Sequence, residues 1–94
     1  MRTEMVDIYS DQTNAAILRH PGRRFPGVLV QGDSLSRLCQ QADSVCAGAK
    51  AVLDDELYEE MDGLRETLRA YLNHYKVVLR EHRIELPFSD DPRR

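Results

Sequence analysis

The sequence has no tryptophan, only two cysteines and only three histidines among its 94 residues. Cys39 and Cys46 lie seven positions apart, and no Cys-x-x-Cys pair occurs. In a helix this spacing separates the two Cα atoms by about 10 Å, beyond the roughly 7 Å that a disulfide allows and too far to share one metal ion. We therefore expect no disulfide, no metal and no cofactor, and we expect both thiols to lie on a buried face as small apolar groups.

Long apolar runs and a strong excess of one charge are also lacking. No apolar stretch approaches the roughly 20 residues of a membrane-spanning helix, and no basic and then apolar leader occurs at the N-terminus. The 13 basic and 16 acidic side chains give a net charge of -3, which provides no general attraction to nucleic acid or to an anionic membrane. We expect a soluble, cytoplasmic protein whose partner is another protein or a second copy of itself.

The first third of the chain has the pattern of β-strands. Val6 and Ile8 alternate with more polar residues, which predicts a half-buried strand that ends near Ser10. A second strand is predicted at residues 15–19, although "NAAILR" could open a short helix instead. A third, strongly apolar strand is predicted at residues 27–31.

The loop "HPGRRFPG" between the last two strands is the strongest candidate for a binding site. Its two Pro-Gly pairs each fit the centre of a type II turn. Arginines beside an aromatic ring are typical of protein interfaces, and they also bind phosphates. In the alternative, the arginines pair with the acidic start of the second helix and Phe25 packs in the core. The candidate binding residues are Arg19, His20, Arg23, Arg24 and Phe25.

The remainder predicts two helices, at residues 34–48 and near 55–82. The first has apolar residues spaced by threes and fours, as a one-sided helix requires. The second carries a heptad stripe, begins after Asp54 as a plausible cap, starts acidic and ends basic, as the helix dipole favours. The stripe consists of Leu57, Met61, Leu64, Leu68, Tyr71, Tyr75 and Val78.

The two predicted helices differ in length. At 1.5 Å per residue, the first is roughly 22 Å long and the second roughly 42 Å long. An antiparallel hairpin therefore leaves the C-terminal half of the second helix without a helical partner. That half must cover the sheet, bend back, or contact another chain. Tyr71, Tyr75 and Val78 are accordingly the candidate interface residues, and a homodimer through the long helix is one form of that contact.

Residues 32–35, Gly-Asp-Ser-Leu, resemble the block that carries the nucleophilic serine of the GDSL hydrolases. The resemblance implies a serine hydrolase that uses Ser34. The other blocks of that family are absent: no Gly-x-Asn-Asp occurs, and no histidine has an aspartate three positions before it. A serine without a base and an oxyanion site is inert. The alternative is structural, with Gly32 at a change of direction and Asp33 or Ser34 accepting a hydrogen bond in the first helical turn.

The stretch "HPGRRFPGVLVQGDSL" also resembles a family of small, uncharacterised bacterial proteins, over about residues 7–39. That resemblance implies a bacterial, soluble, stand-alone domain and no particular activity. We predict an α+β fold, in which a small antiparallel sheet of two or three strands precedes an antiparallel helical hairpin with a long second helix. Residues 1–86 should form one domain and residues 87–94 an extended tail.

The function predicted from these features is a non-enzymatic protein-interaction module, of the type of an immunity protein or an antitoxin-like inhibitor of a bacterial protein. One alternative is a binder of a small anionic ligand or phosphate through the basic loop at residues 19–25. The second alternative is the serine hydrolase.

Overall fold

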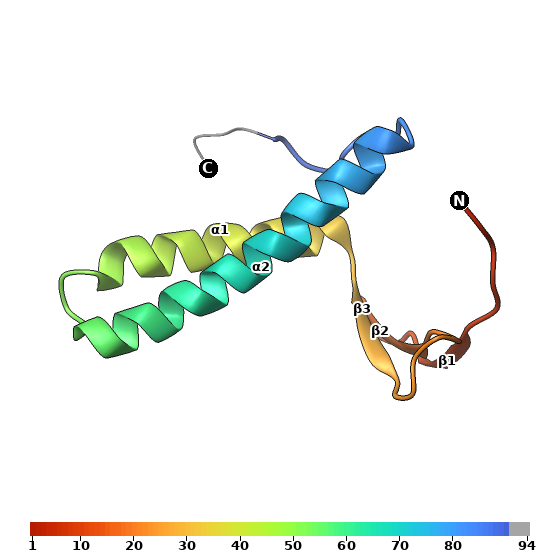
Figure 1. Ribbon diagram of the computed structural model, residues 1–94, viewed down its shortest axis with the longest axis horizontal. Coiled ribbons are helices and arrows are strands. Elements are labelled where there is room, and N and C mark those ends of the chain that lie inside the picture. The colour runs from red at the N-terminus through yellow and green to blue at the C-terminus, as the bar shows by residue number, and fades with distance from the viewer. Residues whose placement is uncertain (91–94) are drawn as a thin grey trace. The chain divides into compact units, whose positions relative to one another are not determined.

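The computed structural model describes residues 1–90 and shows an α+β fold, as the sequence predicts (Figure 1). Its contacts group the chain into two compact units, Met1–Gln31 and the remainder from Gly32 onwards. The first unit holds three strands, β1 (Asp7–Ser10), β2 (Ala15–Arg19) and β3 (Gly27–Val30). The second holds two helices, α1 (Gly32–Ala49) and α2 (Asp55–Glu81). The single domain over residues 1–86 stays a prediction.

The three strands form one antiparallel sheet in the order β1-β2-β3. Ile17 of β2 lies opposite Val28 of β3, and Leu18 lies opposite Ile8 of β1. The central strand is half-buried along its whole length because it has neighbours on both sides, whereas β3 is exposed. Residues 15–19 are therefore a strand, and the helical alternative is wrong.

The turn at residues 20–23 differs from its prediction. The backbone N–H of Arg23 donates to the His20 carbonyl (2.9 Å), which closes a four-residue turn around Pro21 and Gly22. A type II turn needs a positive φ at its third residue, and no glycine among the described residues has one. The prediction of type II turns at both Pro-Gly pairs is therefore wrong. The ring of His20 supplies an additional contact, because its Nδ1 accepts from the Gly22 N–H (2.9 Å).

The two helices form the predicted hairpin, joined by residues 50–54. Asp54 caps α2, as predicted, because its side chain accepts from the Leu57 N–H at 2.8 Å. Helix α1 begins at Gly32, two residues earlier than predicted. Asp33 accepts from the Ser34 N–H (2.9 Å) in the first turn of α1, so Asp33 is the acceptor there.

Small residues of α1 line the seam between the helices. Cys39 and Cys46 are buried, free thiols, as predicted, and they lie among Gly32, Ser36 and the buried Leu72 of α2. The need for glycine at position 32 is spatial, because a Cβ there would overlap the ring of Tyr75. Small side chains at these positions allow two helix backbones to approach closely.

The C-terminal half of α2 contacts Phe88 and Asp90, which belong to the segment predicted to be an extended tail. Helix α2 ends in a Schellman motif, in which Ile84 N–H donates to the Leu79 carbonyl and Arg83 N–H to that of Arg80. Arg83 adopts the required left-handed conformation (φ 55°). The following residues, without helix or strand, return along the hairpin, where Phe88 stacks on Tyr75 with 6.3 Å between ring centroids. Residues 91–94 of the predicted tail lie outside the described residues.

We expect Gly32→Ala to lower the free energy of unfolding by about 1–3 kcal/mol, because the added methyl group must displace the Tyr75 ring. Gly48→Ala is the matched control, since a Cβ there meets nothing within 4 Å and should stabilise the helix by about 0.5–1 kcal/mol. Chemical denaturation measures both. A Gly32→Ala variant as stable as the wild type would show that this glycine is not required for packing.

Candidate functional site

The predicted binding residues lie at the end of the sheet where β2 leads into β3. We call Arg19, His20, Arg23, Arg24 and Phe25 the loop patch. The Arg19 guanidinium donates to Asp7 of β1 (2.8 Å) and to the backbone carbonyl of Arg23 (3.3 Å). Hydrogen bonding to Asp7 raises the pKa of Arg19. Arg19 therefore fixes the loop to the neighbouring strand rather than presenting a free cation.

The other two arginines of the loop patch have no carboxylate partner in the described part of the chain. Arg24 places its guanidinium carbon 5.3 Å from the centroid of the Phe25 ring, within the range of a cation–π contact. Phe25 is 71% exposed, so its ring is not packed in a core. The alternative in which Phe25 is a core residue is wrong.

A shallow hollow adjoins Phe25. It encloses about 150 Å³, and its walls are mainly apolar side chains of β2 and β3 together with parts of the loop patch. Its lining residues are Leu18, His20, Arg23, Phe25, Gly27, Val28 and Leu29. An exposed aromatic ring, an arginine stacked on it and an apolar hollow are the components of a protein-binding hot spot.

Ser34 lacks a bonded histidine in the described part of the chain. It lies in the first turn of α1, half-buried, and among residues 1–90 no hydrogen bond joins its hydroxyl to a histidine. The Gly-Asp-Ser-Leu residues begin a helix, with Gly32 under the Tyr75 ring and Asp33 bonded to the backbone. These residues therefore form the start of a helix, which is the structural alternative to a catalytic site.

The three candidate interface residues on α2 have different surroundings. Tyr71 is 62% exposed, and Val78 is half-buried. Tyr75 lies between Gly32 of α1 and Phe88 of the C-terminal segment, so its ring takes part in packing within the chain. Tyr71 alone of the three presents most of its surface to solvent.

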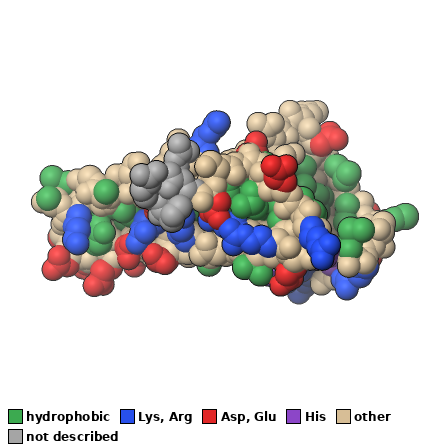
Figure 2. Space-filling view, turned by 90° about the horizontal axis from the view of Figure 1, so that it is seen from above, with side chains coloured by type: hydrophobic (Ala, Val, Ile, Leu, Met, Phe, Trp, Pro, Cys, Tyr) green, Lys and Arg blue, Asp and Glu red, His purple; other side chains and the backbone are tan. Residues whose placement is uncertain are grey.

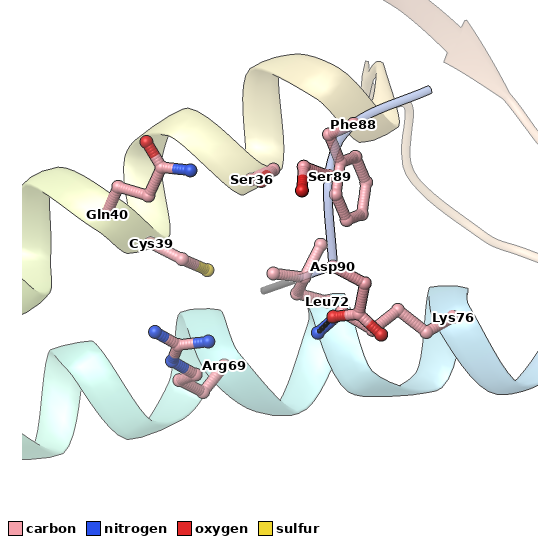
Figure 3. Close-up of a pocket in the computed structure, with 9 residues that line it drawn as sticks. All are labelled: Ser36, Cys39, Gln40, Arg69, Leu72, Lys76, Phe88, Ser89 and Asp90. Carbon is pink, nitrogen blue, oxygen red and sulfur yellow. Dashed lines mark ion pairs between the residues drawn. The ribbon is translucent and has the colours of Figure 1, made fainter. Parts of the chain in front are cut away.

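A small pocket lies where the C-terminal segment crosses the hairpin (Figure 3). Ser36, Cys39 and Gln40 line it from α1, and Arg69, Leu72 and Lys76 from α2, while Phe88 to Asp90 cover it. The space is about 20 Å³, roughly that of one water molecule and too small for a substrate. Burial raises the pKa of Cys39, so this thiol stays protonated and is a poor nucleophile. The pocket is therefore a small gap in the packing of the C-terminal segment against the hairpin.

Two carboxylates, Asp43 and Asp90, pair with basic side chains of α2, and neither is among the candidate residues predicted from the sequence. Asp43 of α1 accepts from Arg69 and, at 3.5 Å, from Arg65 of α2. Asp90 pairs with Arg80 and, at 2.7 Å, with Lys76, which holds the C-terminal segment on α2. The four-residue spacings from Arg65 to Arg69 and from Lys76 to Arg80 show that each pair shares a helix face, but not which carboxylate lies opposite.

Two further kinds of site are absent from the described residues. In residues 1–90 no three His, Cys, Asp or Glu side chains are grouped so that they could hold a metal ion. Neither helix within that range has the length and apolar character to cross a membrane.

We expect Asp43→Ala to lower the free energy of unfolding by about 1–2 kcal/mol, because it removes the part-buried acceptor of two arginines. Asp62→Ala is the matched control. Asp62 pairs with Arg65 within α2 at the (i, i+3) spacing, where about 0.2–0.5 kcal/mol is expected. Urea denaturation of both variants measures the difference, and equal losses would contradict a special role for the contact between the helices.

Docking of the C-terminal segment should depend on pH through Asp90. Hydrogen bonding from Lys76, together with the charges of Lys76 and Arg80, holds the pKa of Asp90 below its usual value. Because the pKa of Asp90 is lowered, its carboxylate stabilises the docked segment at every pH above the ordinary carboxyl pKa of about 3.9. This stabilisation is lost as the pH falls through the lowered pKa. NMR contacts between the Phe88 and Tyr75 rings should be present at pH 7 and should weaken only as the pH falls below the ordinary carboxyl pKa of about 3.9. In Asp90→Asn they should be weak at every pH; full contacts in that variant would refute the role of the carboxylate.

No curated protein and no solved structure matches this chain. Residues 1–88 match a protein family described as a family of unknown function, DUF6959. The match includes both the loop patch and the helical hairpin, in agreement with the resemblance to an uncharacterised family. The chain therefore belongs to the DUF6959 family of unknown function.

Proposed function

We propose that this protein is a non-enzymatic protein-interaction module whose loop patch binds another protein. The observation that carries the proposal is Phe25, an aromatic ring 71% exposed and stacked under Arg24 beside the apolar hollow. Leaving such a ring in water is unfavourable, and aromatic and arginine side chains dominate binding energy at protein interfaces.

The charges of the loop patch indicate the chemistry of the partner. Arg23 and Arg24 have no carboxylate partner among residues 1–90, so an acidic surface could supply one. Strand β3 extends the patch, because it is an edge strand with exposed Val28 and Leu29 side chains. The proposed partner therefore has an acidic rim around an apolar centre. In its finer form, the proposal is an immunity or antitoxin-type inhibitor of a bacterial protein in the cytoplasm.

Binding of phosphate by the same loop is the weaker alternative. Arg19 is already paired with Asp7, and His20 Nδ1 already accepts a backbone hydrogen bond, so two of the four polar side chains are engaged within the chain. Phosphate added to the purified protein separates the alternatives. Thermal stabilisation that is lost in Arg23→Ala would support the anion site.

Affinity capture from the native host tests the proposal, with wild-type protein and Phe25→Ala as baits. We expect one acidic protein whose recovery falls at least about 10-fold with Phe25→Ala, because removal of a hot-spot side chain costs at least 1–2 kcal/mol of binding. Gln12→Ala is the matched control, since Gln12 is an exposed residue of the same unit outside the loop patch. Equal recovery by wild type and Phe25→Ala would show that the loop patch is not the binding site.

A further inference from the structure

The hairpin carries a second row of large apolar side chains beside its seam. Leu38 and Val45 on α1 and Leu57, Leu64 and Tyr71 on α2 are between 43% and 62% exposed. None of them belongs to the buried seam of Cys39, Cys46 and Leu72. A large apolar patch of this kind marks an interaction surface more often than a free surface.

These side chains share one face of the hairpin. Leu38 and Val45 each precede a buried cysteine of the seam, and Tyr71 precedes the buried Leu72. In two antiparallel right-handed helices, the residues one position before the seam turn to the same side. The opposite side carries the contact of Asp43 with Arg65 and Arg69 and the docked C-terminal segment. We call the first side the apolar face.

The spacing on the apolar face is that of a helix–helix interface. Leu38 and Val45 are seven residues apart, as are Leu57, Leu64 and Tyr71 in turn. A repeat of seven keeps side chains along one seam of a coiled coil, where helices of a partner can pack. In the sequence, the α2 row forms one stripe with Met61, Leu68 and Tyr75, but in the structure those three are more buried.

We propose that the apolar face is the interface of a homodimer, in which two hairpins pack face to face as an antiparallel four-helix bundle. The 18 residues of α1 are about 27 Å long, and two helices side by side are about 20 Å wide. Such a face has a flat area of about 540 Å², close to the lower end of the roughly 600–1,000 Å² per partner of a standard interface. A second copy presents the same spacing and the same area, so the two faces match.

Charge selects the antiparallel arrangement. Residues 54–62 contain six carboxylates and no cation, whereas residues 71–80 contain Lys76 and Arg80 and no carboxylate. Acidic side chains gather at the end of the hairpin where α2 begins (Figure 2). A parallel dimer would place two such acidic ends together, whereas an antiparallel dimer keeps them at opposite ends of the bundle. Lys76 and Arg80 already pair with Asp90 within each copy, so the arrangement rests on keeping the acidic ends apart.

The solution mass of the full chain tests the dimer, by light scattering and sedimentation over a range of concentrations. Wild type should have twice the 10.8 kDa mass of one chain. Tyr71→Glu and Leu64→Glu should each raise the dissociation constant by about 100-fold or more, because each buries an unpaired carboxylate in an apolar interface. A wild-type protein that stays monomeric at all concentrations would overturn the proposal.

Asn73→Glu is the matched control, because Asn73 is exposed and lies two residues from Tyr71, turned by about 200° around the same helix. It should remain a dimer. Circular dichroism of each variant confirms that the hairpin is folded, and the high exposure of Tyr71 and Leu64 favours that result. Dissociation by Asn73→Glu to the same degree would contradict the assignment of the face. None of these changes alters the loop patch, so loss of the dimer and loss of the proposed binding partner are separate results.

Disulfide cross-linking tests the orientation. In the antiparallel dimer, Leu57 of one copy lies near Tyr71 of the other, since these residues mark opposite ends of the apolar face. A mixture of Leu57→Cys and Tyr71→Cys chains should form a mixed cross-link on mild oxidation. Leu57→Cys alone and the wild type, whose two cysteines are buried, should form none. A rapid cross-link between two Leu57→Cys chains, with none in the mixture, would contradict the antiparallel arrangement.

Discussion

Close packing of α1 on α2 is the interaction on which the rest of the helical unit depends. Where α1 meets α2, α1 offers Gly32, Ser36, Cys39 and Cys46, and α2 offers the larger Leu72 and Tyr75. Because one side of the seam is small, the helices approach closely, and the charged groups at its edge come within reach of each other. The pairing of Asp43 with two arginines and the stacking of Phe88 on Tyr75 both follow from that approach.

The seam also divides the hairpin into two unlike sides. On one side, ion pairs and the returning C-terminal segment satisfy the charged groups, and the remaining pocket is about the size of one water molecule. On the other side, large apolar side chains remain exposed. The sheet unit has exposed apolar residues of its own, with Phe25 at the loop and Val28 and Leu29 on an edge strand. Both units therefore carry exposed apolar side chains on their surfaces.

The Gly-Asp-Ser-Leu residues illustrate how a short motif acquires its meaning from its surroundings. The same letters that surround a nucleophile in a hydrolase here start a helix, because Gly32 leaves room for the Tyr75 ring and Asp33 accepts a backbone hydrogen bond. Ser34, which follows them, has no histidine bonded to it in residues 1–90. Neighbours distant in sequence decide between the two roles, and Tyr75 is 43 residues away from Gly32.

The sequence by itself determined most of the elements: the first strand from alternation, the third from its apolar run, the helices from spacings of three and four, the Asp54 cap, and two buried free thiols. It left residues 15–19 open between strand and helix. The elements that it determined depend on local periodicity and local hydrogen bonds, which neighbouring residues decide. Tertiary structure alone decided that Phe25 is exposed, that Tyr75 packs within the chain, and that Asp43 and Asp90 are the acceptors of the helix arginines. The physical reason is that spacing fixes the face of a helix on which a side chain lies, whereas its partner across the seam depends on how the helices pack and where the chain returns.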